Sequence, residues 1–254
     1  MGREEKIELL NGFFQENPKA ALGFSGGVDS AYLLYAGCRA GAKIQPFFVK
    51  TPFQPEFELE DGKRLAKELG VSLQVVEFDV LKVEQAASNP PDRCYYCKKA
   101  LFGALREAAG REGYSLLLDG TNASDDAGDR PGMRAIKELF VRSPLRECGL
   151  TKAEIREASR EAGLFTWNKP AYACLATRIP AGERITAEKL RKIEEGEKAL
   201  AQMGFSDFRI RLFQGAARIQ LPPDEMEMAV ARRKEIREAL EGNFLAVLLD
   251  LKER

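Results

Sequence analysis

The stretch Ser25-Gly26-Gly27-Val28-Asp29-Ser30 constrains the fold of this chain more than any other segment. A short and mostly apolar run, 20–24, precedes it, and residues 31–38 carry apolar side chains at helical spacing. A strand, a glycine turn and a helix in this order direct backbone N–H groups and a helix N-terminus toward an anion. Gly26 and Gly27 let the backbone approach phosphate oxygens because they have no Cβ atom. The pattern favours a phosphate-binding turn over an ordinary strand-to-helix turn.

The polar side chains of the stretch fit the same interpretation. Ser25 and Ser30 add hydroxyl donors, and Asp29 is suited either to orienting a Mg2+ ion or to capping the helix. No Gly-Lys-Ser/Thr follows at the spacing of a Walker A loop. The stretch resembles instead the signature of the PP-loop ATP pyrophosphatases. That resemblance implies that ATP is bound here as a substrate and cut between its α- and β-phosphates.

Composition excludes several classes of function. The 254 residues include no histidine, so histidine bases, Cys-His dyads and histidine metal sites are excluded. The 39 basic residues balance 39 acidic ones, which gives no electrostatic reason to expect a nucleic-acid partner. No apolar run approaches the ~20 residues of a membrane span, and no secretory signal follows the N-terminus. We expect a cytoplasmic protein that does not associate with membranes.

Strands alternate with helices over the first part of the chain, which predicts an α/β fold with a doubly wound parallel sheet. The expected strands are 20–24, 43–50, 72–78 and 116–118, and the expected helices are 4–16, 31–41, 56–69, 98–111 and 151–163. A different pattern follows residue 180 and predicts a smaller α+β domain. Its expected elements are helix 186–203, strands 207–213 and 216–221, helix 224–241 and strand 244–250. We predict two domains, residues 1–180 and 181–254.

A second polar segment follows the predicted strand at 116–118. Ligands of parallel sheets bind beyond the carboxyl ends of the strands, so this segment should lie near the glycine turn. Its residues are Asp119, Gly120, Thr121 and Asn122. Asp125, Asp126 and Asp129 come next in a polar loop, which suits contacts to ribose or Mg2+ and simple solvation equally well.

The five cysteines are an odd number in a reducing compartment, which favours metal binding or catalysis over disulfides. Cys94 and Cys97 form a C-x-x-C too far from an opening strand for a thioredoxin-like pair, and zinc would need four ligands. An iron–sulfur cluster held by Cys94, Cys97 and Cys174 fits best and leaves one iron open for an exogenous sulfide. The alternative, that these are small buried residues, stays open. Cys38 and Cys148 are assigned to packing.

The assembled motifs resemble the LarE family of PP-loop sulfur transferases. The matching segments, besides the glycine stretch, are 92–98, Asp119–Asn122 with Asp125-Asp126, Arg130-Pro131-Gly132, Lys169-Pro170-Ala171 and 173–180. The resemblance implies adenylation of the carboxylates of pyridinium-3,5-biscarboxylic acid mononucleotide, with release of pyrophosphate. A sulfur nucleophile then displaces AMP, and two rounds give the bisthiocarboxylate of the nickel-pincer cofactor pathway of lactate racemase.

The resemblance leaves two sources of sulfur. One branch of the family sacrifices the sulfur of the cysteine at position 174 and leaves dehydroalanine. Another branch holds a [4Fe-4S] cluster on three cysteines, and Cys94, Cys97 and Cys174 place this chain there. The sulfide donor is not identified, and the family implies a homo-oligomer. A PP-loop tRNA thiolase is a further alternative, which the neutral charge and the short α+β tail argue against.

The resemblance also assigns residues to the substrate. Arg209, Arg211 and Arg218, with Arg178, match basic positions near the substrate phosphate, where guanidinium groups give bidentate contacts. Trp167 either belongs to the core or stacks on a flat substrate. Two positions depart from the family pattern. Phe213-Gln214 stands where a histidine is expected, and Thr177 replaces the commoner serine.

Overall fold

The computed structural model describes residues 1–125 and 131–252, so Asp126, Asp129 and Arg130 lie outside the described residues. The chain divides into two compact units, Met1–Val83 with Asp92–Tyr172, and Glu84–Pro91 with Ala173–Arg254. The sequence predicted a single division near residue 180. Glu84–Pro91 joins the second unit because the Asn89 side chain donates to the carbonyls of Ile179, Pro180 and Glu183, at 3.3, 2.8 and 3.2 Å.

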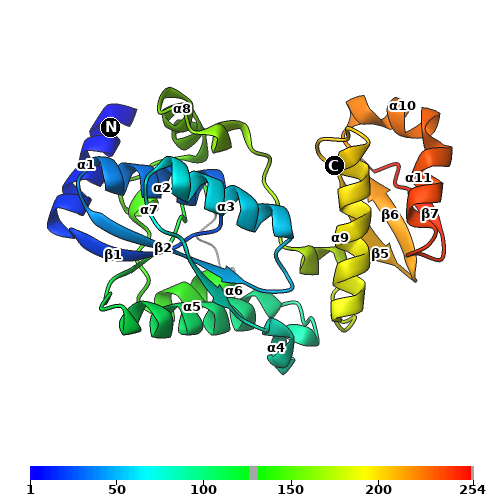
Figure 1. The fold of residues 1–254 in the computed structure, drawn as a ribbon, viewed down its shortest axis with the longest axis horizontal. Helices are drawn as coiled ribbons and strands as arrows, with labels where there is room; N and C mark the ends of the chain where they lie inside the picture. The colour runs from blue at the N-terminus through cyan, green and yellow to red at the C-terminus, as the bar shows by residue number, and fades with distance from the viewer. Residues whose placement is uncertain (126–130, 253–254) are drawn as a thin grey trace. The chain divides into compact units, whose positions relative to one another are not determined.

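The first unit is built on a parallel sheet, which confirms the predicted α/β fold (Figure 1). Its strands lie in the order β3-β2-β1-β4, and each neighbouring pair is parallel. Their bounds are β1 Lys19–Gly23, β2 Lys43–Lys50, β3 Gln74–Glu77 and β4 Leu117–Leu118. Arg142 adds a parallel bridge to Leu118 beyond β4. Because β1 lies inside the sheet, the glycine stretch that follows it starts at the middle of one sheet edge.

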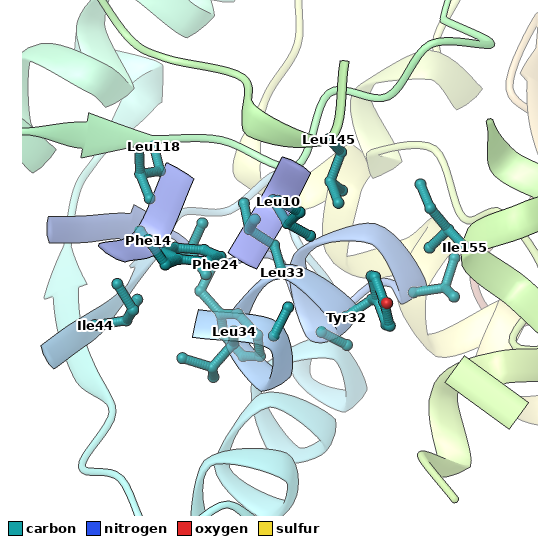
Figure 2. Packing of buried hydrophobic residues seen from close by; sticks show 14 of the residues in the cluster. Leu10, Phe14, Phe24, Tyr32, Leu33, Leu34, Ile44, Leu118, Leu145 and Ile155 are labelled. Atoms are coloured by element: carbon teal, nitrogen blue, oxygen red, sulfur yellow. The ribbon is translucent and has the colours of Figure 1, made fainter. Parts of the chain in front are cut away.

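Helices cover both faces of this sheet, because the side chains of each strand alternate between two cores. Ala20 and Leu22 of β1 pack into a core with α1, α2 and α8, and Figure 2 shows Phe14, Leu33 and Ile155 there. Ala21 packs on the opposite face with α5 and α6. The helices are α1 Arg3–Glu16, α2 Val28–Arg39, α3 Glu56–Glu68, α5 Arg93–Arg111, α6 Pro131–Glu138, α7 Pro144–Glu147 and α8 Lys152–Glu161, with 3-10 turns η1 Val80–Lys82 and η2 Phe165–Asn168.

The second unit is a small α+β fold, as the pattern after residue 180 predicted. Strand β5 Arg209–Phe213 pairs antiparallel with β6 Ala216–Gln220, which pairs in parallel with β7 Val247–Leu249. The helical segments are α4 Glu84–Ala87, η3 Leu175–Arg178, α9 Ala187–Gln202, α10 Pro223–Ala231 and α11 Arg233–Leu240. The single helix predicted at 224–241 is wrong. Arg232 leaves helical geometry between α10 and α11 (φ −96°, ψ 17°), and its guanidinium donates to the carbonyl of Met203.

No helix in the described part of the chain is both long enough and apolar enough to cross a bilayer. The 19-residue α5 has the greatest length among the described helices, but it carries basic and acidic side chains along its course.

Candidate functional site

The glycine turn is preformed by its own side chains. Gly26 has φ +71°, and a Cβ atom there would lie 2.9 Å from the carbonyl oxygen of Glu58, so only glycine fits. Gly27 caps α2 in an extended conformation. The Ser30 hydroxyl donates to the Gly27 carbonyl at 3.1 Å and lies 3.1 Å from the Ser25 hydroxyl. This arrangement leaves the N-terminus of α2 facing the end of β1, which is the geometry of an anion site.

The segment after β4 lies against this turn. A Cβ atom on Gly120 would come within 2.9 Å of the backbone nitrogen of Ser30, so the two backbones are in close contact. The Asn122 side-chain amide donates to Oδ1 of Asp29 at 3.3 Å. The structure therefore brings the two segments together at one sheet edge, where the sequence placed them.

Asp119 has a different position from the one expected for a ligand contact. It is buried, and its carboxylate accepts hydrogen bonds from the hydroxyls of Thr121 and Ser143, both at 2.6 Å. The backbone N–H of Thr121 also donates to it, at 3.2 Å. Asp119 and Thr121 thus shape the turn that presents Asn122 to Asp29.

Lys152, which was not singled out from the sequence, is the basic partner of the glycine turn. Its Nζ lies 2.6 Å from Oδ2 of Asp29. Burial raises the pKa of the Asp29 carboxyl above its ordinary value, and the Lys152 ammonium opposes that rise. The sequence held a signal for this position, because Thr151 and Glu154 form a capping box that makes Lys152 the first residue of α8.

A cavity of about 240 Å³ opens beside the glycine turn and was also missed from the sequence. It lies at the carboxyl ends of β1 and β2 and is mostly apolar, with one acidic and one basic residue in its lining. The lining comprises Gly23, Phe24, Ser25, Phe47, Phe48, Val49, Gln54, Glu58, Lys98, Leu101, Phe102 and Leu105. A flat apolar group attached to a phosphate at the turn fits such a position.

The C-x-x-C motif occupies the first turn of α5, where Cys94 and Cys97 lie three residues apart and so on one helix face. Cys94 is exposed and Cys97 is half-buried. The Arg93 guanidinium donates to the Cys94 sulfur at 3.7 Å. Two accessible thiols on one face are a donor set that suits a soft metal or an iron–sulfur cluster.

The third predicted ligand, Cys174, belongs to the second unit. In the part of the chain that the structure describes, no three cysteine, aspartate or glutamate side chains lie together as a metal site. Cys94 and Cys97 belong to the first unit, and the cluster stays a prediction. Cys38 and Cys148 pack with the first core, as expected, and burial raises the pKa of both thiols.

The loop of Cys174 is fixed by a buried arginine. Arg178 is 1% exposed, and its guanidinium donates to both carboxylate oxygens of Glu197, at 2.8 and 3.2 Å. The same group donates to the carbonyl of Ala173 at 2.8 Å. The Thr177 hydroxyl donates to the carbonyl of Cys174 at 2.8 Å, a bond that the commoner serine would also make. The structure thus places Arg178 in the interior, where it supports the cysteine loop.

The other predicted arginines lie on the sheet of the second unit. Arg209 is buried and donates to the Phe208 carbonyl at 2.6 Å, while Arg211 donates to the carbonyl of Thr177 at 2.8 Å. Burial, with Arg178 and Arg218 nearby, lowers the pKa of Arg211. Arg178, Arg209 and Arg218 pair with Glu197, Asp207 and Asp250, so an anion bound here would compete with these carboxylates for the guanidinium groups.

Trp167 and Phe213, the two aromatic residues that the sequence analysis considered near the substrate, lie near the surface. Trp167 is 37% exposed in η2, and its carbonyl accepts a hydrogen bond from Arg156 at 2.7 Å. Phe213, where a histidine was expected, is also partly exposed, with the Arg218 guanidinium 5.4 Å from its ring centroid. Both rings are accessible enough to contact a planar ligand.

Comparisons with known proteins agree with the geometry. No family model matches the chain. An uncharacterized protein of Synechocystis is 36% identical over 252 residues, which cover 98% of this chain and 94% of that protein. The pyridinium-3,5-bisthiocarboxylic acid mononucleotide synthase of Lactiplantibacillus plantarum is 30% identical over 236 residues, 92% of this chain and 86% of the relative. The tRNA-specific 2-thiouridylase MnmA of Pseudothermotoga lettingae is 29% identical over 217 residues, 70% of this chain and 62% of that enzyme. The chain therefore belongs to the LarE family of PP-loop proteins, the family of the pyridinium-3,5-bisthiocarboxylic acid mononucleotide synthase.

Proposed function

We propose that this protein is an ATP-dependent sulfur transferase that converts the carboxylates of pyridinium-3,5-biscarboxylic acid mononucleotide into thiocarboxylates. The observation that carries the proposal is that Asp29, Asn122 and Lys152 meet at the glycine turn. They do so in a chain that is 30% identical to a pyridinium-3,5-bisthiocarboxylic acid mononucleotide synthase. This arrangement offers hydrogen-bond donors for phosphate and a carboxylate for Mg2+ at one point.

In the adenylation step, the phosphates of ATP lie on the glycine turn and on the N-terminus of α2. The adenosine occupies the cavity at the ends of β1 and β2. Asp29 would hold Mg2+, which would neutralise charge on the phosphates, and Lys152 beside it is the cation of this chain's own at the same point. A carboxylate oxygen of the substrate attacks the α-phosphorus, and the bond to the bridging oxygen of the β-phosphate breaks. Pyrophosphate leaves with that electron pair, and Lys152 and the helix N-terminus stabilise its charge.

In the sulfur-transfer step, a sulfur nucleophile attacks the acyl carbon and AMP leaves. Cys94, Cys97 and Cys174 would hold a [4Fe-4S] cluster, which supplies an iron without a protein ligand for an exogenous sulfide. The alternative source is the Cys174 sulfur itself, whose loss leaves dehydroalanine. In both cases the cysteine loop must present Cys174, and the bonds from Arg178 and Thr177 fix the backbone on both sides of that residue.

Binding of the substrate phosphate is assigned to the arginines of the second unit. Arg211 donates to the Thr177 carbonyl of the cysteine loop, and Arg218 lies opposite Arg211 on β6, where it pairs with Asp250 at 3.4 Å. Arg209 supports the strand, and stacking on the pyridinium ring is assigned to Trp167. A homo-oligomer is implied by the family resemblance and a cytoplasmic location is expected from the sequence, and both remain predictions. The similarity to MnmA supports a second candidate, a tRNA thiolase, but the balanced charge of the chain gives no general attraction to RNA.

The proposal is tested by anaerobic purification with quantitation of iron, sulfide and pyrophosphate. We expect bound iron in the wild type and in Cys148→Ala, which alters a packed cysteine, and loss of iron in Cys97→Ala. ATP with the pyridinium dicarboxylate should release pyrophosphate and give a thiocarboxylate by mass spectrometry. Absence of iron, with one sulfur lost from Cys174 during turnover, would instead support the sacrificial route. Thiolation of a purified tRNA pool without thiocarboxylate formation would favour the thiolase.

A further inference from the structure

We propose that Lys169 is a positioning residue that couples nucleotide binding at the glycine turn to the connector, residues 167–172, which leads to Cys174. The inference rests on the proposed function, because it concerns how the sulfur-bearing loop responds to ATP. The Lys169 ammonium lies 2.6 Å from Oδ2 of Asp61 in α3 and donates to the carbonyl of Gly26 at 3.2 Å. It thus ties the connector directly to the turn that would hold the phosphates.

The backbone of the connector is held from its other side by Arg156 of α8. The Arg156 guanidinium donates to the carbonyl of Trp167 at 2.7 Å and to the carbonyl of Lys169 at 2.8 Å. Pro170 follows and favours the extended conformation that Lys169 adopts, with φ −61° and ψ 127°. Because the backbone is held in this way, the long side chain of Lys169 is directed to the glycine turn.

The end of the connector also packs on α3. The ring of Tyr172 meets Phe57 edge-on, with centroids 5.0 Å apart, and the Lys169 ammonium lies 5.4 Å from the same Phe57 ring. The Lys169 side chain is only 15% exposed, so its charge is weakly screened by solvent. A triphosphate on the glycine turn would bring negative charge toward this ammonium and strengthen its attachment to the turn.

The consequence concerns the timing of sulfur transfer. Cys174 follows Lys169 by five residues in the chain, and η2 ends at Asn168, directly before Lys169. If ATP tightens the attachment of Lys169, the segment that leads to the sulfur is already held in place when the adenylate forms. An acyl adenylate that waits for sulfur is exposed to water, so coupling the two events limits its hydrolysis.

Hydrogen–deuterium exchange tests this coupling in the full chain, with Mg2+ and α,β-methylene-ATP, whose α–β linkage cannot be cut. The amides of Trp167 and Lys169 donate to the carbonyls of Leu164 and Thr166, so their exchange reports opening of the connector. In the wild type, we expect the analogue to slow exchange both in the glycine turn, 23–30, and in the connector. Connector exchange should slow by roughly tenfold, the size expected for one strengthened hydrogen bond to a charged group.

The informative variant is Lys169→Met, which keeps the length of the side chain and removes its charge. We expect protection of the glycine turn to persist while protection of the connector is lost, and Lys169→Arg should restore part of it. Arg160→Met is the matched control, because Arg160 contacts the Trp167 ring at 6.0 Å but has no bond to the glycine turn.

Two results would overturn the inference. Equal protection of the connector in Lys169→Met and the wild type would show that the attachment carries no coupling. If Lys169→Met loses protection in the glycine turn as well, Lys169 binds the nucleotide directly and does not act through the connector. A wild type that shows no protection at the glycine turn would count against the proposed ATP binding, which is a separate failure.

Discussion

The glycine turn and the cysteine loop both depend on an ion pair, but the two pairs differ in exposure. Asp29 and Lys152 have side chains that are 22% and 33% exposed, whereas those of Glu197 and Arg178 are 6% and 1% exposed. A partly exposed pair can exchange one partner for an ion or a phosphate at small cost, because water solvates the released group. A buried pair cannot, because the group left behind would be an unpaired charge in the interior.

This difference distinguishes charges that can bind a ligand from charges that support the fold. Under the proposed function, the charges at the glycine turn would meet ATP and Mg2+, whereas the charges at the cysteine loop hold Ala173 and the helix α9 in place. Arg178 and Asp29 are therefore expected to respond to substitution in opposite ways.

Arg178→Met should give the largest change in stability. It leaves Glu197 buried without its cation, and breaking a buried pair in this way costs about 3–5 kcal/mol in the free energy of unfolding. Urea denaturation measures the change. The control is Arg191→Met, which breaks an exposed pair with Glu195 on the same helix and should cost below about 0.5 kcal/mol. Similar losses in the two variants would remove the distinction between scaffold and binding charges.

Asp29→Asn should lower pyrophosphate formation by roughly 100- to 1,000-fold, since it removes a charge that positions Mg2+ and phosphate. Its effect on stability should be the reverse of that of Arg178→Met. Burial raises the pKa of Asp29 above 3.8, so the folded state binds this proton more tightly than the unfolded state. The free energy of unfolding of the wild type therefore falls as the pH rises from 3.8 through the raised pKa of Asp29.

The asparagine variant lacks this titration, so its free energy of unfolding should exceed that of the wild type at neutral pH. Urea denaturation at a series of pH values, beside a pyrophosphate assay, measures both effects. A variant that is less stable than the wild type at neutral pH, yet fully active, would show that Asp29 is a structural residue.

Gly120→Ala tests the close contact between the two segments of the glycine-turn site. The new Cβ atom would lie 2.9 Å from the Ser30 nitrogen, and overpacking of this kind costs about 1–3 kcal/mol. Thermal or urea unfolding measures the cost, and the affinity for the ATP analogue should fall with it. Gly103→Ala is the control, because no atom lies within 4 Å of a Cβ there and the change should be neutral or stabilising.

Glu154→Ala should have the smallest effect, about 1 kcal/mol, typical of a lost helix cap. At the start of α8, the Glu154 carboxylate accepts hydrogen bonds from Lys6 of α1 and from the Thr151 backbone, and these bonds lower the pKa of its carboxyl to about 2. A lowered pKa contributes stability at pH values above 4.5 that is lost as the pH falls toward about 2. The difference in the free energy of unfolding between Glu154→Ala and the wild type, measured by urea denaturation, should therefore shrink in acid. An unchanged difference would contradict the assigned ion pair.

Several parts of the fold followed from local pattern. The apolar runs at β1 and β2 predicted strands that the structure confirms within a few residues, and the helices expected at 151–163 and 186–203 are α8 and α9. The helix broken at Arg232 was not predictable in this way. Its sequence has continuous helical periodicity, and the break depends on a hydrogen bond to Met203, which is distant in the chain.

The sequence by itself determined that a glycine turn starts a helix inside a parallel sheet, and that Asn122 and Asp29 share one edge of it. It could do so because strand direction and residue spacing are local properties, and the carboxyl ends of parallel strands meet at the same edge. Only the tertiary structure decided that Lys152 pairs with Asp29, that Lys169 reaches Gly26, and that Arg178 is buried against Glu197. Pairings between charges far apart in the chain depend on how helices pack, and burial is decided only when the packed elements exclude water.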